Sequence, residues 1–276
     1  MNVVPVNAKF SYNIIKGSVK SRQKIVSELN EKFFESSLVY INNKRVLAED
    51  LKKIFIKILP EKKIIEIKKF KPTGAYAAAS DYTYDKNENI KGLSLEIPFL
   101  NSKMSSKDIP TLMHELTHIF ATLTNPKHTA LSQKMLGEDK YKNHYNNWYQ
   151  NVLYNDEKIT QAYTVKDMLE SVKESTLHLL ENKKNHDKVN FLQDARYELQ
   201  QELDAHKEQL KYAQKLKNMG FDVNENDLVD EDRYFFFTEK IQLLNEILAD
   251  VLAKTRKKNS SKIMKKESST LKLNIS

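Results

Sequence analysis

The chain of 276 residues contains no cysteine, and glycine is scarce, with only 5 positions. Without cysteine the protein can form no disulfide bond, no thiolate metal site and no cysteine nucleophile. Any metal that it binds must therefore be held by histidine and carboxylate side chains. The scarcity of glycine favours helices, because glycine weakens helix interiors.

Long hydrophobic runs are also absent. No window approaches the roughly 18 apolar residues of a membrane-spanning helix, and residues 1–20 lack the apolar run of a secretion signal. We therefore expect no transmembrane segment and, by default, a cytoplasmic location. Secretion by a route without a signal peptide leaves no mark in a sequence and stays open.

Arginine is rare in an otherwise basic chain. Lysine supplies 40 of the 45 basic residues, and the formal net charge is +8. Folded proteins that read a nucleic-acid sequence depend on the bidentate guanidinium of arginine, which lysine cannot replace. We therefore expect a solvated lysine surface and no sequence-specific binding of nucleic acid.

The residues that are present suit a globular, mostly helical chain, since 40% are hydrophobic and 12 Phe and 13 Tyr are available for a core. Apolar residues at helical spacing predict helices over 18–35, 49–59, 160–181, 188–218 and 238–257. Alternating or β-branched segments predict two or three antiparallel strands within 62–70, 75–84 and 93–99, and a hairpin about Asn42 and Asn43.

These elements predict an α+β fold in a single domain over residues 1–256. A mixed lobe of about 1–124 would carry a small antiparallel sheet, and a helical lobe of about 125–256 would follow it. Residues 257–276, KKNSSKIMKKESSTLKLNIS, are basic and rich in serine. We predict that this tail is disordered.

Residues 111–120, TLMHELTHIF, form the most informative segment of the chain. His114 and His118 stand four positions apart, so on a helix their imidazoles project from one face. Between Thr111 and Phe120 the only charged residue is Glu115, which is unusual in so lysine-rich a chain. Three residues before the segment are candidate helix caps: Ser105, Ser106 and Asp108. An apolar stripe would bury the helix against the predicted strands, and it consists of Ile109, Leu112, Leu116, Ile119 and Leu123.

This segment resembles the active-site helix of the zincin metallopeptidases, in its His-Glu-x-x-His spacing and its uncharged flanks. The resemblance implies that His114 and His118 bind Zn²⁺ and that Glu115 acts as the general base. It also implies a third ligand from further along the chain. In metzincins that ligand is a histidine six residues after the second one, but Thr124 stands there and excludes that class. His128 follows the helix-ending Pro126 and is interpreted as a surface histidine.

In gluzincins the third zinc ligand is a glutamate on a later helix. The best candidate for this ligand is Glu202. It lies at the flank of an apolar stripe, and the segment from Glu202 to His206 is similar to the Glu-x-Glu-Ala-Asp helix of several gluzincin-like families. His206 departs from that pattern, although it could still form a hydrogen bond around the metal ligands. A rival arrangement has Glu198 as the ligand and Glu202 as the supporting carboxylate. We prefer Glu202 because Glu198 lies further from the stripe.

The resemblance implies a zinc-dependent hydrolase of the zincin fold, most simply a peptidase acting on peptide or protein substrates. An oxyanion stabiliser would come from Arg196, Tyr197, His144 or the tyrosines of 141–154, and the sequence does not choose among them. Two alternatives stay open. The chain could be a catalytically inactive binding protein of the same fold, or a basic protein that uses its lysine surface and tail on acidic partners.

Overall fold

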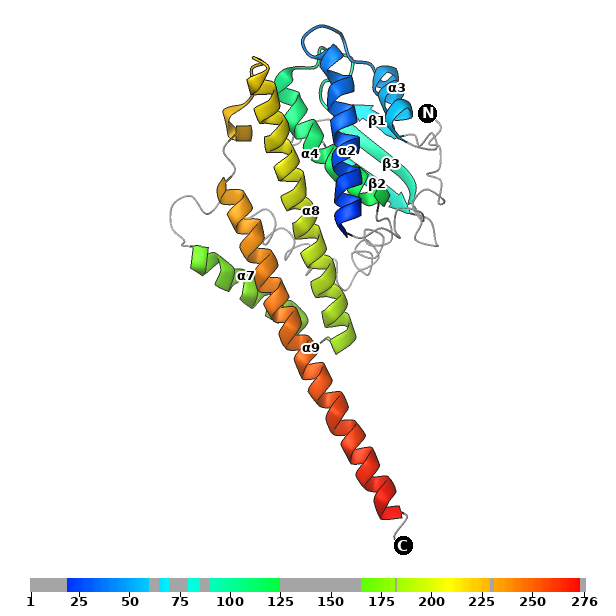
Figure 1. The fold of residues 1–276 in the computed structure, drawn as a ribbon, viewed down its shortest axis with the longest axis vertical. Helices are drawn as coiled ribbons and strands as arrows, with labels where there is room; N and C mark the ends of the chain where they lie inside the picture. The colour runs from blue at the N-terminus through cyan, green and yellow to red at the C-terminus, as the bar shows by residue number, and fades with distance from the viewer. Residues whose placement is uncertain are drawn as a thin grey trace. The chain divides into compact units, whose positions relative to one another are not determined.

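The chain divides into two compact units that do not follow its sequence order. In a computed structural model, which describes residues 19–59, 65–69, 79–84, 90–124, 165–181, 183–228 and 231–273, the first unit is Met1–Glu138 with Gln201–Phe235. The second unit is Asp139–Gln200 with Phe236–Ser276. Two long helices, α8 (Asn185–Asn218) and α9 (Glu231–Leu273), contribute to both units (Figure 1). This division differs from the predicted lobes because residues 201–235 return to the unit that holds the His-Glu-x-x-His segment.

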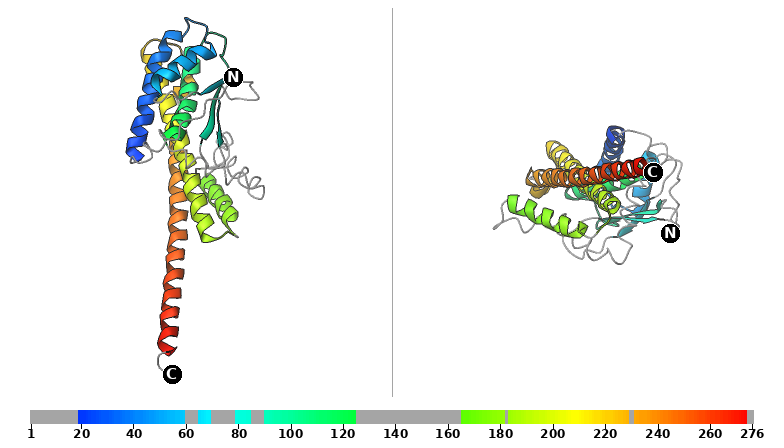
Figure 2. Two further views of the ribbon diagram at one scale, coloured as in Figure 1. Left: turned by 90° about the vertical axis from the view of Figure 1, so that its right-hand side faces the viewer. Right: turned by 90° about the horizontal axis from the view of Figure 1, so that it is seen from below.

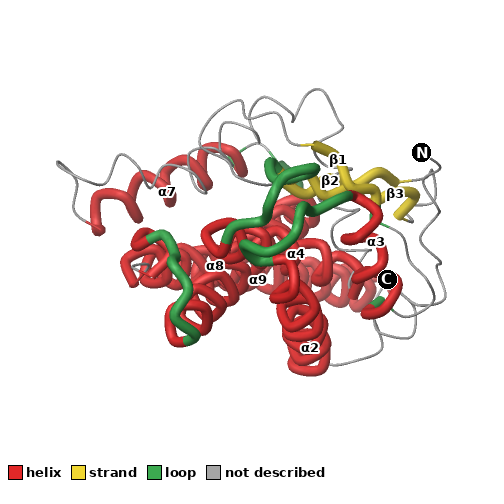
Figure 3. The backbone as a smooth tube through the Cα atoms, turned by 90° about the horizontal axis from the view of Figure 1, so that it is seen from above, coloured by secondary structure: helices red, strands yellow, loops and turns green. Residues whose placement is uncertain are grey.

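The first unit is layered around α4 (Ile109–Thr124), the helix of that segment. One side of α4 packs against the sheet and the other against α2 (Val19–Ser37), as the views in Figures 2 and 3 also show. A further helix, α3 (Ala48–Ile58), packs against α2 and β1. The layers share one apolar core, whose deeply buried aromatic and aliphatic side chains include Phe33, Leu51, Phe55, Ile65, Leu95, Leu116 and Phe120. The predicted α+β class, mostly helical with a small sheet on the motif helix, is confirmed.

The sheet contains β1 (Glu66–Lys69), β2 (Ala79–Tyr84) and β3 (Ile90–Ile97) in the order β1-β3-β2. Strands β2 and β3 are antiparallel, as predicted, but β1 and β3 are parallel. The prediction of an antiparallel sheet is therefore wrong for β1. The chain reverses direction between β1 and β2 and again between β2 and β3, so β1 and β3 run the same way. Because β3 lies between the other two strands, it pairs with β1 in parallel.

Residues 38–46 do not form the predicted hairpin. A 3₁₀ turn, η1 (Leu38–Tyr40), is followed by Asn42 with φ of 58°, a conformation that asparagine tolerates better than most residues. The backbone then pairs with the segment before α4, where Asn42 N donates to Met104 O at 2.9 Å and Val46 N donates to Ser102 O at 2.7 Å. The turn signal was correct, but its flanks bind another part of the chain and brace the approach to α4.

The second unit contains α7 (Val165–Leu180), the first half of α8 and α9 from residue 236 onward. Each of these helices buries apolar side chains, among them Val172, Leu180, Phe191, Leu192, Leu199, Phe236, Phe237 and Leu244. None of the helices in the described part of the chain has a stretch long and apolar enough to cross a membrane.

The basic tail is helical over most of its length, because α9 continues to Leu273. This differs from the predicted disorder of residues 257–276. Extending an existing helix adds one hydrogen bond for each residue fixed, so it avoids the cost of nucleation. Lysine, leucine, methionine and glutamate are also good helix formers, which favours this continuation.

Candidate metal centre

The motif helix begins at a capping box. Ser105 N donates to the Asp108 carboxylate at 2.8 Å, and the Ser105 hydroxyl accepts from Lys107 N at 3.2 Å. A short 3₁₀ turn, η3 (Ser106–Asp108), leads directly into α4. The predicted apolar stripe is fully buried, with exposure of 0% at Ile109, Leu112, Leu116, Ile119 and Leu123. This anchoring leaves the two histidines at the edge of the stripe, where they face α8.

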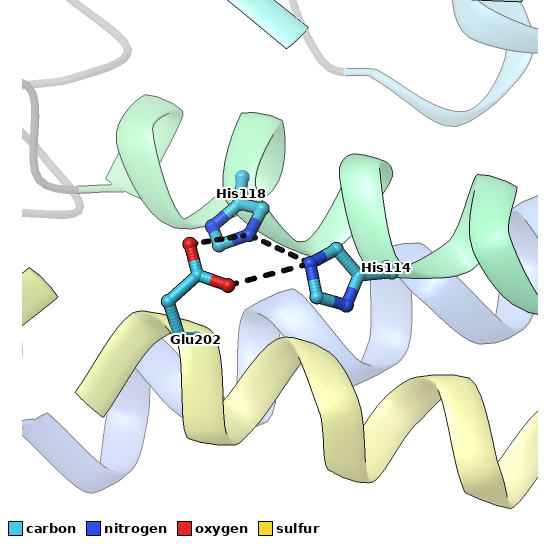
Figure 4. Close-up of side chains that lie close together, drawn as sticks. All are labelled: His114, His118 and Glu202. Carbon is cyan, nitrogen blue, oxygen red and sulfur yellow. Dashed lines mark hydrogen bonds and ion pairs between the residues drawn. The ribbon is translucent and has the colours of Figure 1, made fainter. Parts of the chain in front are cut away.

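The structure brings His114 and His118 of α4 together with Glu202 of α8 (Figure 4). The Nε2 atoms of the two histidines are 3.2 Å apart. Glu202 Oε2 lies 3.5 Å from His114 Nε2, and Glu202 Oε1 lies 3.5 Å from His118 Nε2. The side chains of His114, His118 and Glu202 are only 12%, 14% and 17% exposed. Each carboxylate oxygen thus faces one imidazole in a site that is largely shielded from water.

These distances match the spacing that a tetrahedral zinc ion requires of its ligands. With metal–ligand bonds of about 2.0–2.2 Å, ligand atoms at tetrahedral angles stand about 3.3–3.6 Å apart. The shortest separations are 3.2, 3.5 and 3.5 Å, with a different Glu202 oxygen facing each imidazole, and one ligand atom from each of the three residues lies within 4.8 Å of the other two. Two imidazole nitrogens and one carboxylate are also ligand types that zinc accepts, so the residues fit the metal in both geometry and chemistry.

The charge state of Glu202 agrees with a role as a cation ligand. Burial acts to raise the pKa of Glu202, but the charge of His118 and hydrogen bonds from His114 and His118 oppose it. Together they hold the pKa of this carboxyl well below its usual range. Glu202 is therefore ionised at neutral pH, which is the form that binds a metal ion.

His206 lies one turn after Glu202 on α8 and packs against a ligand. Its ring meets that of His114 edge-on, with centroids 4.6 Å apart and an angle of 70° between the planes. His206 is 9% exposed. Its contact with His114 is thus made by ring packing, which restricts the orientation of the His114 imidazole.

The rival glutamate, Glu198, is not part of the group. It lies one turn before Glu202, in the part of α8 that belongs to the second unit. There its charge adds to the effect of burial on a neighbouring carboxyl, and together they raise the pKa of Asp194 to about 7. Of the two glutamates, Glu202 is the one that the structure brings to the histidines.

The other predicted site residues are not part of the group formed by His114, His118 and Glu202. Glu115 is partly exposed and follows His114 on α4. Arg196 donates to the Asn245 side chain at 3.0 Å within the second unit. The candidates in the region 125–164, which include His128, His144 and the tyrosines of 141–154, lie outside the described residues.

Two residues near the site were missed by the sequence analysis. Tyr234 donates its hydroxyl to the backbone carbonyl of His206 at 2.8 Å, and no local pattern singles it out. Asn30 is 0% exposed and bonds to the side chain of Thr117 at 2.9 Å. Asn30 carries a recognisable signal, because it is a polar residue within the apolar stripe of α2.

Known proteins give no independent guide to this site. No protein-family model matches the chain, and comparison with curated proteins and with solved structures finds no similar protein either.

Proposed function

We propose that the protein is a zinc-dependent hydrolase that cleaves peptide bonds and resembles the gluzincin-like zincins. The observation that carries this proposal is the approach of Glu202 to both histidines of the His-Glu-x-x-His helix. A surface helix with two incidental histidines would not need a buried, ionised carboxylate opposite them, since a buried charge without a partner is costly.

The proposed ligands suit a catalytic metal. His114, His118 and Glu202 are three protein ligands, which is the number that catalytic zinc sites use while leaving a position for water or substrate. Two neutral imidazoles and one carboxylate leave a net positive charge on the ion. When bound, zinc supplies Lewis acidity, which lowers the pKa of water to about 7 and polarises a carbonyl group.

The proton transfers are assigned to Glu115. A carboxylate oxygen of Glu115 takes a proton from the attacking water and then passes it to the nitrogen of the leaving amine. Support for this role comes from its position, because Glu115 directly follows His114 on the anchored helix α4. His206 packs on His114 and so restricts the orientation of this proposed ligand.

The test combines zinc analysis with a substrate screen on the purified full-length protein. We expect about one zinc per chain and cleavage of peptides in a mixed pool, detected by mass spectrometry. A protein that takes up no zinc even when it is supplied would contradict the proposal altogether. A protein that binds zinc but cleaves neither peptides nor other amides would instead be a metal-binding protein without this activity.

A further inference from the structure

A buried asparagine joins the two helices that carry the proposed ligands. Asn30 lies on α2, and its Nδ2 donates to Thr117 Oγ1 on α4 at 2.9 Å and to Glu208 Oε2 on α8 at 3.4 Å. Thr117 immediately precedes His118, and Glu208 lies six residues after Glu202. One amide group therefore contacts both helices close to the candidate metal centre.

The surroundings determine which way this amide points. The Thr117 hydroxyl donates its only proton to Met113 O at 2.7 Å, so its oxygen is left to accept from Asn30. The Glu208 carboxylate, which Lys211 holds at 2.9 and 3.2 Å, accepts hydrogen bonds and donates none. Only a side chain with two N–H donors satisfies both neighbours at once. An aspartate at position 30 would place a second carboxylate against Glu208.

Stability alone does not account for an asparagine here. Asn30 is flanked on α2 by Val26, Leu29, Phe33 and Phe34, all of which are buried in the core. The Oδ1 atom of Asn30 is buried and finds no hydrogen-bond partner among the described residues. Burying an unbonded carbonyl is unfavourable, so an apolar residue would suit this stripe better. Buried polar groups of this kind can instead specify one arrangement of helices over others.

We propose that Asn30 is a positioning residue that sets the register of α4 against α8 and thereby keeps His118 and Glu202 at ligand distance. This inference rests on the proposed metal site. The tolerance of such a site is small, because ligand distances must agree within about 0.2 Å. A slip of one residue along a helix moves a side chain by about 1.5 Å, which is enough to separate the ligands.

Side-chain bonds also join α2 to α8, among them Gln23 to Asp204 and Tyr212 to Glu31, both at 3.2 Å. The bonds that tie α4 to the segment after α8 lie at the start of α4. Lys107 Nζ is 2.8 Å from the Asp222 carboxylate, and the Ser106 hydroxyl bonds to the Asp222 carbonyl. These contacts precede His118 by more than ten residues, or over about 15 Å of chain. They attach one end of α4, whereas Asn30 acts next to the ligand itself.

The test is a cobalt(II) titration of the metal-free, full-length protein, in which the visible absorption of the bound ion reports both affinity and coordination geometry. Asn30→Leu removes both donors without adding a charge, and Asn30→Asp keeps the size but reverses the polarity. Ser37→Ala is the matched control, since Ser37 is also 0% exposed on α2, and within the described part of the chain its hydroxyl bonds only to Phe34 O of its own helix. Thermal unfolding of the metal-free forms separates loss of fold from loss of register.

We expect both Asn30 variants to bind cobalt about 10–100-fold more weakly than wild type, with an altered spectrum, because supporting groups around metal ligands have effects of this size. Ser37→Ala should keep the wild-type affinity and spectrum even if its unfolding temperature falls. A folded Asn30→Leu with wild-type affinity and spectrum would overturn the positioning role while leaving the metal site intact. A wild type that binds no cobalt would overturn the proposed function and this inference with it.

If the Asn30 variants do not fold, Thr117→Val tests the same bond from the other helix. It keeps the shape of the side chain and removes the hydroxyl that accepts from Asn30. We expect weaker cobalt binding in the same range, about 10–100-fold. Where the single variants fold, Asn30→Leu combined with Thr117→Val should weaken binding no further than Asn30→Leu alone, because the bond that Thr117→Val removes is one of the two that Asn30→Leu already removes. Fully additive losses would overturn the proposal.

Discussion

Glu202 and Asp194 are carboxyl groups two turns apart on α8, and both are shielded from solvent, yet their pKa values shift in opposite directions. Burial raises both, but Glu202 faces two imidazoles that outweigh burial and hold its pKa well below the usual range. Asp194 has Glu198 nearby, whose charge adds to burial and raises its pKa to about 7. The neighbours of a buried carboxyl, more than its burial, therefore decide whether it can bind a cation.

The largest expected effect comes from removing a proposed ligand. Glu202→Ala and His118→Ala should each reduce bound zinc from about one per chain to almost none, because two remaining ligands cannot form a tight site. Glu198→Ala is the matched control, since it removes a glutamate one turn away on the same helix. It should retain zinc. Elemental analysis after dialysis measures all of these variants, and loss of zinc in Glu198→Ala alone would assign the ligand to the other glutamate.

We expect Glu115→Gln to change the zinc content little but to lower the peptidase activity strongly. This variant should keep its zinc, because Glu115 is not one of the three converging groups. Its rate of peptide hydrolysis should fall by about 10²–10⁴-fold, since the amide cannot accept the proton of the attacking water. Zinc content and the rate of peptide hydrolysis are measured on the same preparation and compared with those of wild type. Equal rates in wild type and variant would contradict the role assigned to Glu115.

The comparison on α8 also shows what the sequence could and could not predict. Glu202 was preferred to Glu198 because it lies nearer the apolar stripe of its helix, and the structure brings it to the histidines. Helical periodicity likewise predicted α2, α3, α4 and α8 to within a few residues. Ser105, the observed cap before the motif helix, was one of the three predicted candidates. These features depend on residues that are close in the chain, so local patterns carry them.

Features that depend on distant partners were not predictable in the same way. The strand signal of β1 was visible, but its parallel pairing with β3 depends on which strand takes the centre of the sheet. The turn at Asn42 was visible, but its pairing with Met104 was not. Asn30 was visible as a polar residue in an apolar stripe, whereas its two partners lie 87 and 178 residues away. Long-range hydrogen bonds leave no periodic signal, because each is made by a single side chain.

The remaining expected effect is on stability, and it concerns the other carboxyl of the comparison. Between the ordinary pKa of aspartate, 3.8, and about 7, Asp194 is protonated in the folded chain and ionised in the unfolded one. The folded state then binds more protons, so its stability falls as pH rises through this range and levels off above about pH 7. Asp194→Asn removes the titration. It should therefore be more stable than wild type at pH 8 by up to about 4 kcal/mol, given about 1.4 kcal/mol for each pKa unit.

Urea unfolding of wild type and Asp194→Asn at pH 5 and pH 8 measures this difference, which should be larger at the higher pH. Glu198→Gln provides the complementary variant, because it removes the neighbouring charge and keeps the Asp194 carboxyl. It should lower the pKa of Asp194 and recover only part of the stability, since burial is the larger cause of the shift. Stabilities of wild type and Asp194→Asn that change in parallel with pH would mean that Asp194 is ionised when folded. Asp194 and Glu202 would then both be ionised in the folded protein and would differ only in the groups around them. Asp194 would be a second carboxylate on α8 that is able to bind a cation.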